Sequence, residues 1–255
     1  MYKTLLVDTQ DNTLSIRLNR PEVLNALTLE LLSELKEALI EAAEQKNVRA
    51  VLLTGEGRGF CAGADLATTP FEEVKEVVET YYNPVIHLLV TMPKPVIAAI
   101  NGVAAGAGMS LTLACDMRLM SEGAALTAGF TKIGLSLDAG MSFFLPRLVS
   151  RGRAFELAYS NRAVTSAEAL QLGLVERVLP NEGFAEAAFA FARELARGPA
   201  SFSLVKQLFN EAATNDLEKQ LRLEATLQAK AASTKDAAEG IGAFAEKRKA
   251  VFSGQ

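Results

Sequence analysis

The sequence of 255 residues predicts an α/β fold that ends in a helical C-terminal region. Through residue 179, short apolar segments alternate with segments of helical period, an order typical of α/β proteins. Beyond Pro180 the pattern is almost wholly helical. No linker rich in proline or serine divides the chain. We therefore expect one core, residues 1–195, and an appended helical region, residues 196–255.

The elements of the first half follow from hydrophobic periodicity. Residues 14–18 alternate apolar and polar side chains, which predicts a strand. Over residues 28–45 apolar side chains recur at helical spacing and glutamates occupy mainly the other positions, so we expect an amphipathic helix with a solvated acidic face. Residues 50–54 and 96–100 are short apolar runs that predict buried strands, each followed by a turn that contains glycine.

The second half continues the alternation and then becomes helical. Residues 117–120 and 174–179 are predicted strands. Predicted helices cover residues 184–196, 201–210, 217–232 and 236–249. Long helices of this kind at a C-terminus often pack on another subunit, so we expect oligomerisation there.

Composition and charge exclude several classes of protein. Hydrophobic residues make up 49% and charged residues 22%, as in ordinary globular proteins. The formal net charge of −4 leaves no basic excess for a nucleic-acid backbone, so nucleic acid is not an expected partner. No apolar run predicts a signal peptide or a membrane span, and we expect a cytoplasmic protein without a membrane partner. Cys61 and Cys115 match no disulfide framework or zinc spacing, so no metal site is expected.

Two turns rich in small residues follow predicted strands. They are Phe60-Cys61-Ala62-Gly63-Ala64-Asp65-Leu66 and residues 101–110. Neither matches a phosphate-binding loop. In the second turn, Gly106-Ala107-Gly108 opens a predicted helix over residues 109–115, whose free amides and dipole favour an anionic oxygen. Tight packing of helix on strand would explain the same glycines.

Four polar residues outside these turns are candidates for a structural or a chemical role. Taken alone, Asp138 is typical of an N-cap for a helix that begins near Ala139, but its apolar neighbours predict a partly dry setting that raises its pKa and suits a general base. His87 lies among apolar residues and is predicted to be a core or interface residue rather than a base. Asp116 and Arg118 are predicted to form a structural pair.

Five blocks of sequence together resemble the enoyl-CoA hydratase/isomerase (crotonase) family. They occur in the family's order and span nearly the whole chain: Asn19-Arg20-Pro21 with Asn25-Ala26-Leu27, residues 60–66, residues 94–102, Ala114-Cys115-Asp116, and residues 169–175. The resemblance implies a crotonase-like spiral of β-β-α units and acyl-CoA thioester substrates. It implies no cofactor, because CoA is part of the substrate. The C-terminal region, residues 196–255, would form a homotrimer or a dimer of trimers.

The resemblance also assigns roles to individual positions. The backbone N–H groups of Ala64 and Ala107 would form an oxyanion hole, in which two aimed donors stabilise an enolate oxygen. Residues implied to contact the substrate or its CoA are Val23, Ala26, Ala62, Asp65 and Leu66, with Phe244 and Lys247 reaching the CoA nucleotide of a neighbouring subunit. Lys247 is equally typical of a solvated surface cation.

The same comparison separates hydration from isomerisation. The family's hydratases hold a water between two glutamates, but Ser110 and Phe130 occupy those positions in this sequence. Asp138 stands instead at the carboxylate position of the family's isomerases, and the sequence around it is similar to a subgroup that acts on an aromatic ring epoxide. One base suffices for isomerisation, since it can take a proton from one carbon and return it two carbons away. A relocated base leaves hydratase activity as the alternative.

Two other activities found among crotonase relatives fit less well. A dehalogenase would use the aspartate position as a nucleophile beside a histidine base, where this sequence has Asn83. An RNA-binding homologue would need a lysine-rich helix where this chain has the acidic face between Glu30 and Glu44. The sequence therefore favours an acyl-CoA isomerase whose exact acyl group stays open.

Overall fold

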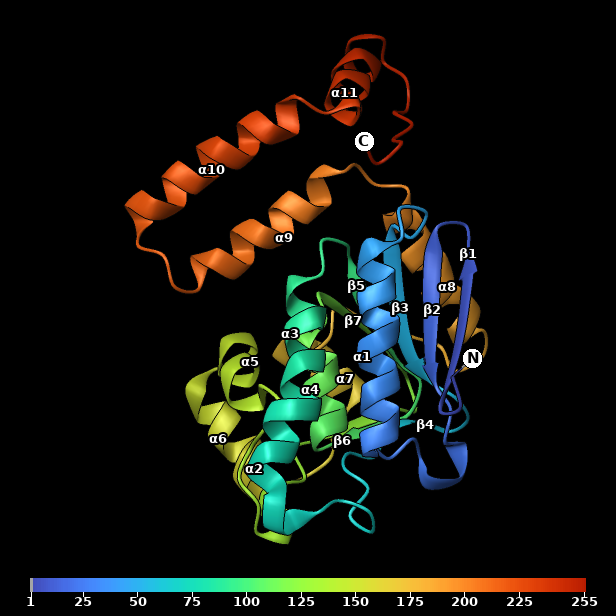
Figure 1. Cartoon of the computed structure of the whole chain (residues 1–255), viewed down its shortest axis with the longest axis vertical. Helices are drawn as coiled ribbons and strands as arrows, with labels where there is room; N and C mark the ends of the chain where they lie inside the picture. Colours follow the sequence, from blue (N-terminus) through green and yellow to red (C-terminus); the bar gives the residue numbers. More distant parts are fainter. Residues whose placement is uncertain (1) are drawn as a thin grey trace.

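The computed structural model describes residues 2–255 and contains two β-sheets covered by helices (Figure 1). The larger sheet has six strands in the order β1-β2-β3-β5-β7-β10. These strands are β1 (Leu5–Gln10), β2 (Thr13–Leu18), β3 (Ala50–Gly55), β5 (Val96–Ile100), β7 (Met117–Ser121) and β10 (Arg177–Leu179). From β2 to β10 all neighbours are parallel, and β1 pairs antiparallel with β2 at the edge.

In the smaller sheet, three of the four strands directly follow strands of the larger one. The smaller sheet has the order β4-β6-β8-β9, with β4 (Gly59–Cys61), β6 (Val103–Ala105), β8 (Ala125–Thr127) and β9 (Val164–Thr165). Thus β3 leads to β4, β5 to β6 and β7 to β8, and each pair is followed by helix. This winding confirms the predicted α/β fold of repeated β-β-α units.

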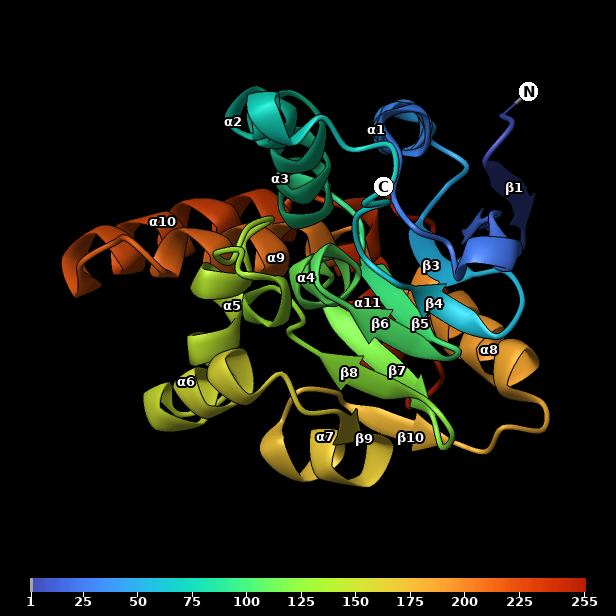
Figure 2. The same cartoon turned by 90° about the horizontal axis from the view of Figure 1, so that it is seen from below.

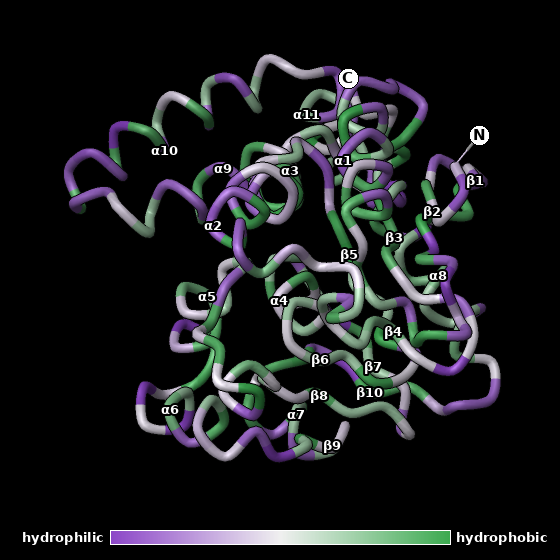
Figure 3. Tube along the Cα trace, turned by 60° about the horizontal axis from the view of Figure 1, so that its bottom comes forward, coloured by the Kyte–Doolittle hydropathy of each residue, from purple (hydrophilic) through white to green (hydrophobic). Residues whose placement is uncertain are grey.

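The larger sheet packs against a hydrophobic layer on each face, because the side chains of its strands point alternately to the two faces. Val51 and Leu53 of β3 lie in the main core with α1 (Leu29–Glu44), α3 (Asn83–Thr91) and α4 (Ala107–Ala114). Ala50 and Leu52 point to the other face and pack beneath α8 (Phe184–Ala196). Because successive side chains of a strand alternate between faces, the first four residues of β3 are all apolar and buried, two on each side of the sheet. Figure 3 shows the hydrophobic residues concentrated along these central strands.

The remaining helices surround this core. They are α2 (Val74–Val77), α5 (Met141–Leu148), α6 (Arg151–Ser160), α7 (Ser166–Leu172), α9 (Ser201–Ala212), α10 (Leu217–Ala232) and α11 (Lys235–Ala245). Figure 1 shows α9 and α10 as an arm that extends from the core, with α11 and the C-terminus at its base. None of the helices within residues 2–255 is long and apolar enough to cross a bilayer.

Several predicted boundaries were wrong for local reasons. In the segment 174–179 only β10 is a strand, because Leu174 closes the end of α7 through a hydrogen bond from its N–H to the Ala169 carbonyl. The helix predicted over residues 236–249 ends at Ala245, and Lys247 follows in a left-handed turn with φ +55°. The strand β1 was not predicted, since it is exposed except at its first residue and lacks a hydrophobic alternation.

The structural interpretations of Asp116, Arg118 and His87 also need correction. Asp116 does not pair with Arg118: its Oδ2 accepts from Lys206 Nζ of α9 at 2.9 Å and from the Val96 N–H at 2.7 Å. Arg118 instead pairs with Glu176. His87 lies exposed on α3, which excludes the core interpretation, and the interface interpretation stays a prediction.

Candidate active site

The first part of the site is the junction where β4 and its following turn pack against the start of α4. A side chain at Gly108 would collide with the Cys61 carbonyl, so only glycine lets helix and strand approach this closely. Gly63 has φ +97°, and a Cβ there would lie 2.9 Å from the Ala105 carbonyl oxygen. The glycines therefore permit tight packing of helix on strand, and this packing brings Ala64 beside the beginning of α4.

The backbone amides of Ala64 and Ala107 are left available by this junction. Ala64 forms a parallel bridge with Leu27, through hydrogen bonds from Leu27 N–H to Gly63 O at 2.7 Å and from Asp65 N–H to Leu27 O at 2.9 Å. In such a bridge the Ala64 N–H points away from Leu27. Ala107 is the first residue of α4, where an amide has no partner within the helix. The Cβ position of Gly63 lies only 3.6 Å from the Ala107 nitrogen, so the two amides border one small region.

Asp138 lies in the loop before α5 and is not a helix cap. The helix begins at Met141, its N-cap is Gly140 with φ +80°, and no side chain caps it. The N-cap interpretation of Asp138 is therefore wrong. Its Oδ1 atom is buried and has no hydrogen-bond partner within the described chain. Burial raises the pKa of Asp138 to about 6, because little surrounds the carboxylate that stabilises its charge.

Ser110 connects the two parts of the site. It is fully buried on α4, and its Oγ lies 3.2 Å from the backbone carbonyl of Asp138 and 3.4 Å from that of Gly106. The same Asp138 carbonyl accepts from the Met141 N–H at 3.0 Å. Ser110 thus anchors the Asp138 loop to the helix that supplies the Ala107 amide, a contact that no sequence pattern indicated. Figure 2 shows α4 between the small sheet and α5.

Phe130, the other position where hydratases carry a glutamate, is a buried core residue. It directly precedes the 3-10 turn of residues 131–133, and its carbonyl accepts hydrogen bonds from the N–H groups of Ile133 and Leu135. Neither Ser110 nor Phe130 can hold a water between carboxylates.

The residues expected near CoA fall into two groups. Val23, Ala26, Ala62, Asp65 and Leu66 come together where residues 24–27 pair with residues 62–65 through backbone hydrogen bonds, including Ala62 N–H to Leu24 O at 2.9 Å. Val23, Ala62 and Leu66 are exposed there, whereas Ala26 is buried.

Asp65 has a structural partner that sequence reasoning missed. Arg20 Nη1 lies 3.0 Å from Asp65 Oδ2 and donates to the Ala26 carbonyl at 2.6 Å. This pair joins the two segments of the first group and fixes the approach to Ala64.

The second group, Phe244 and Lys247, lies far from this site within the chain. Figure 1 places α11 at the opposite end of the molecule from β4 and β6. Phe244 is 87% exposed, and Lys247 is also exposed. The expected contact with a neighbouring subunit's CoA stays a prediction.

Tyr82 is a further residue that sequence reasoning did not single out. It is 4% exposed and ends a π-helical turn, residues 78–82, immediately before α3. Burial, and next the negative charge of Asp138, raise the pKa of Tyr82 above its ordinary value. The phenol is therefore neutral near the Asp138 carboxylate. Single π-turns of this kind are frequent at functional sites.

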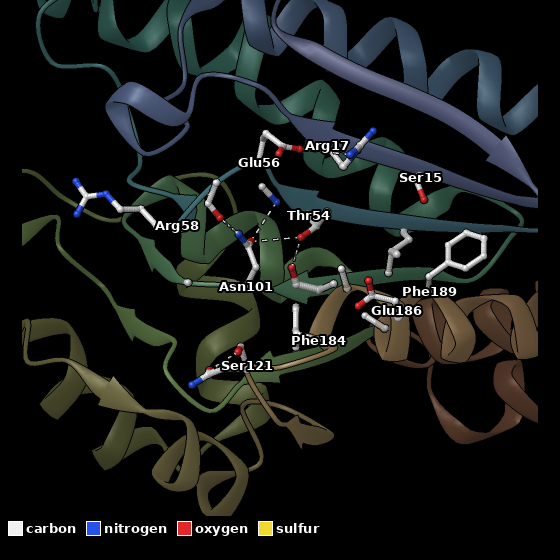
Figure 4. A pocket seen from close by; sticks show the side chains of 18 of the residues that line it. Ser15, Arg17, Thr54, Glu56, Arg58, Asn101, Ser121, Phe184, Glu186 and Phe189 are labelled. Atoms are coloured by element: carbon white, nitrogen blue, oxygen red, sulfur yellow. Dashed lines mark hydrogen bonds and ion pairs between the residues drawn. The ribbon is translucent and has the colours of Figure 1, made fainter.

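A separate cavity of about 810 Å³ lies on the α8 side of the large sheet (Figure 4). Ser15 and Arg17 of β2 line it together with Thr54 of β3. Thr54 Oγ1 donates to the Ala99 carbonyl at 2.7 Å, and Arg17 lies 3.4 Å from Glu56. None of the residues predicted for CoA chemistry lines this cavity.

Comparison with known proteins gives consistent matches over the whole chain. A family model described as Enoyl-CoA hydratase/isomerase matches residues 8–255. The chain is 38% identical over 262 residues to the 1,2-epoxyphenylacetyl-CoA isomerase of Escherichia coli (strain K12), covering 100% of both chains. It is 33% identical to the crotonyl-CoA hydratase of Syntrophomonas wolfei, covering 98% of each. The crystal structure of an enoyl-CoA hydratase from Bacillus anthracis superposes with a TM-score of 0.92 at 38% identity, covering 99% of this chain and 100% of the other.

Proposed function

Because the chain belongs to the enoyl-CoA hydratase/isomerase (crotonase) family, we propose that it is an acyl-CoA isomerase whose acid/base group is Asp138. One observation carries this proposal: Asp138 presents a partly buried carboxylate whose Oδ1 has no hydrogen-bond partner within residues 2–255. A carboxylate in that state is stabilised by accepting a proton. Its pKa of about 6 keeps it ionised at neutral pH and close to the value that suits reversible proton transfer.

The two amides supply the electrostatic part of the reaction. With the thioester oxygen between the N–H groups of Ala64 and Ala107, removal of a proton from C2 of a 3-enoyl-CoA places negative charge on that oxygen. Asp138 takes this proton, and the electrons of the C–H bond form a dienolate. Asp138 then returns the proton to C4, and the double bond lies between C2 and C3. Protons and electrons balance without another reactant.

Ser110 and Tyr82 would support this chemistry without exchanging protons. The Ser110 contact fixes the backbone of Asp138 relative to α4, which carries the Ala107 amide. The distance between base and oxyanion is thereby set by one short chain of contacts. Tyr82 adds a neutral wall near the carboxylate, which excludes part of the surrounding water.

For the substrate we propose 2-(1,2-epoxy-1,2-dihydrophenyl)acetyl-CoA, with 3-to-2 enoyl-CoA isomerisation as a second activity of the same site. Support comes from the full-length similarity to the 1,2-epoxyphenylacetyl-CoA isomerase of Escherichia coli. Both conversions begin with charge developing on the thioester oxygen, so one oxyanion hole serves both.

Enoyl-CoA hydration is the second candidate, and similarity to a crotonyl-CoA hydratase favours it. Hydration needs a base that activates water, and Ser110 and Phe130 offer none. An RNA-binding role is disfavoured, because Glu30, Glu37 and Glu41 of α1 lie exposed on the surface where a basic helix would be needed.

We also propose that other copies of the chain cover the arm formed by α9 and α10. Phe209, Leu217 and Leu221 are exposed there, and a groove of about 550 Å³ lined by Val205 and Phe209 separates α9 from the core. Apolar surface of this kind favours burial in a trimer or a dimer of trimers. Phe244 and Lys247 would then reach a neighbour's CoA.

A panel of three thioesters tests the proposed function. Wild-type protein is incubated with 3-enoyl-CoA, 2-enoyl-CoA and epoxyphenylacetyl-CoA, and products are separated by chromatography and mass spectrometry. The proposal predicts an isomer of unchanged mass from the first and third substrates and no rapid addition of water to the second. A product heavier by one water as the main outcome would favour the hydratase alternative.

A further inference from the structure

A second cavity, of about 680 Å³, lies between α5 and α6 and has no role in the reaction described above. Leu137, Met141 and Leu145 form one wall, and Ala154, Phe155 and Ala158 of α6 form the other. Its size is in the range of small-molecule sites, and such sites are typically apolar with a few polar groups at defined places.

The charges of this cavity are unbalanced. Arg147 and Arg151 line it, and no aspartate or glutamate does. Neither arginine has an ion-pair partner within residues 2–255: Arg147 lies 3.6 Å from the centre of the Phe143 ring and donates to the Phe143 carbonyl, and Arg151 lies 5.5 Å from the centre of the Phe155 ring. Two cations beside an apolar wall attract an anion.

Two other arginines, which do have carboxylate partners, provide a comparison. Arg153, on the same helix as Arg151, lies 3.0 Å from Glu156. In the cavity of Figure 4, Arg17 lies 3.4 Å from Glu56 and 3.6 Å from Asp8, so that cation is already compensated. In the cavity between α5 and α6, by contrast, two arginines without an ion-pair partner in the described chain lie beside apolar side chains.

We propose that this cavity binds an amphipathic anion, a compound with an aromatic or branched apolar body and one carboxylate. The body lies between Met141 and α6, and the carboxylate lies at Arg147 and Arg151. Such a group has two sources: a free organic acid, or the far end of an acyl chain that carries a second carboxylate. The cavity adjoins the catalytic loop, because Leu137 directly precedes Asp138 and the Met141 N–H bonds the Asp138 carbonyl.

Calorimetric titration with 4-phenylbutanoate tests the site, and the uncharged 4-phenylbutanamide is the control ligand. We expect the acid to bind more tightly than the amide. The double variant Arg147→Gln, Arg151→Gln should weaken acid binding by about tenfold or more, because charge-assisted contacts are lost. Arg153→Gln is the matched control and should bind as wild type does. Equal binding of acid and amide, no binding of the acid, or an unaffected double variant would overturn the proposal.

A variant that fills the cavity without changing a charge controls for unspecific effects of the arginine substitutions. Ser142 lines the cavity from the exposed side of α5, so Ser142→Phe should occupy space without disturbing the core. We expect this variant to keep its circular-dichroism spectrum and to lose binding of 4-phenylbutanoate. Undiminished binding would place the acid elsewhere and refute the site.

The two sources of the anion are separated with suberyl-CoA, which carries a free carboxylate at its far end, and octanoyl-CoA, which does not. If the acyl end occupies the cavity, the double arginine variant weakens suberyl-CoA binding alone, and 4-phenylbutanoate competes with suberyl-CoA. If a free acid is the ligand, 4-phenylbutanoate binds together with either thioester. Both results support the anion site and differ only in its source.

Discussion

Two partly buried aspartates in different regions of the chain allow a comparison between a structural role and the proposed chemical role of the same side chain. Asp116, at the start of β7, is bonded by Lys206 and by the Val96 N–H, and these contacts tie α9 to the sheet. Asp138, in the loop before α5, has a buried oxygen with no partner in the described chain. Burial raises the pKa of both carboxyls, but at Asp116 the positive charge of Lys206 opposes the shift.

The backbone is unstrained around Asp116 and strained next to Asp138. Asp116 lies directly before β7 and joins two regular elements, β5 through the Val96 N–H and α9 through Lys206. Asp138 is followed by Ala139 with φ +48°, a left-handed conformation that costs a residue with a Cβ about 1 kcal/mol or more. An unpartnered carboxylate next to a strained residue persists only where surrounding contacts, here those of Ser110 and Met141, hold it in place. We interpret the loop as organised for proton transfer at some expense of stability.

Replacing each aspartate by asparagine gives the largest expected difference. Asp138→Asn should lower isomerisation by ~10²–10⁴-fold, because a general base is lost while both backbone amides remain. Asp116→Asn should retain near wild-type turnover. Initial rates with a 3-enoyl-CoA, together with thioester affinity by calorimetry, check both. Comparable rate losses in the two variants would remove the distinction between the sites.

The pH dependence of kcat/KM should follow the ionisation of Asp138 and should not depend on Asp116. Asp138 works as an ionised base, so kcat/KM should rise with pH through about 6 and level off above it. Below that value the rate should fall about tenfold per pH unit. The profile is recorded with wild type and with Asp116→Asn, which should keep the same midpoint. A flat profile between pH 5 and 8 would contradict an Asp138 base.

Stability should respond mainly to Asp116. Asp116→Ala removes the carboxylate partner of Lys206, whose side chain is 9% exposed, and we expect the free energy of unfolding to fall by about 1–3 kcal/mol. Urea denaturation measures the change. The double variant Asp116→Ala, Lys206→Met should recover part of it, since no unpaired buried cation remains. No recovery would mean that the pair is not what ties α9 to the core.

The smallest expected effect is a gain in the free energy of unfolding for Asp138→Asn, opposite in sign to the loss expected for Asp116→Ala. The folded state raises the pKa of Asp138, so proton binding stabilises the fold below about pH 4 and this contribution is lost as the pH rises through about 6. Asp138→Asn carries no charge and should therefore be slightly more stable than wild type at pH 7, by about 1 kcal/mol or less because the site is partly solvated. The two proteins should converge at pH 4. A less stable variant at pH 7 would indicate that the ionised carboxylate has a favourable partner.

Much of the fold could be predicted because the spacing of apolar residues along the sequence indicates which face of each helix or strand is buried. The alternating faces of β3 and the apolar stripe of α1 require specific neighbours, and the sequence displays both. The exposed edge strand β1 left no such pattern, since its pairing depends on backbone hydrogen bonds with β2. Short strands such as β9, with two residues, are defined only by their neighbours.

The candidate site could be predicted in part for a related reason. The resemblance to the crotonase family assigned Ala64 and Ala107, the apolar neighbours of Asp138 and the same resemblance indicated Asp138, and glycines marked the close approach of β4 and α4. The Ser110 contact, the Arg20–Asp65 pair and the position of Tyr82 join residues 28 to 56 positions apart, or depend on an irregular turn. Such contacts follow from the folded path of the chain, which local sequence patterns do not contain.

A carbon-13 titration of the aspartate carboxyls tests the central claim most directly. Protein labelled at aspartate Cγ is titrated from pH 3 to 9 by NMR, and the Asp138 resonance is assigned by its absence in Asp138→Asn. The account predicts a midpoint of about 6 for this resonance. A midpoint near the ordinary aspartate value of about 4 would contradict it, because an unperturbed carboxylate would not be the desolvated base proposed for the reaction.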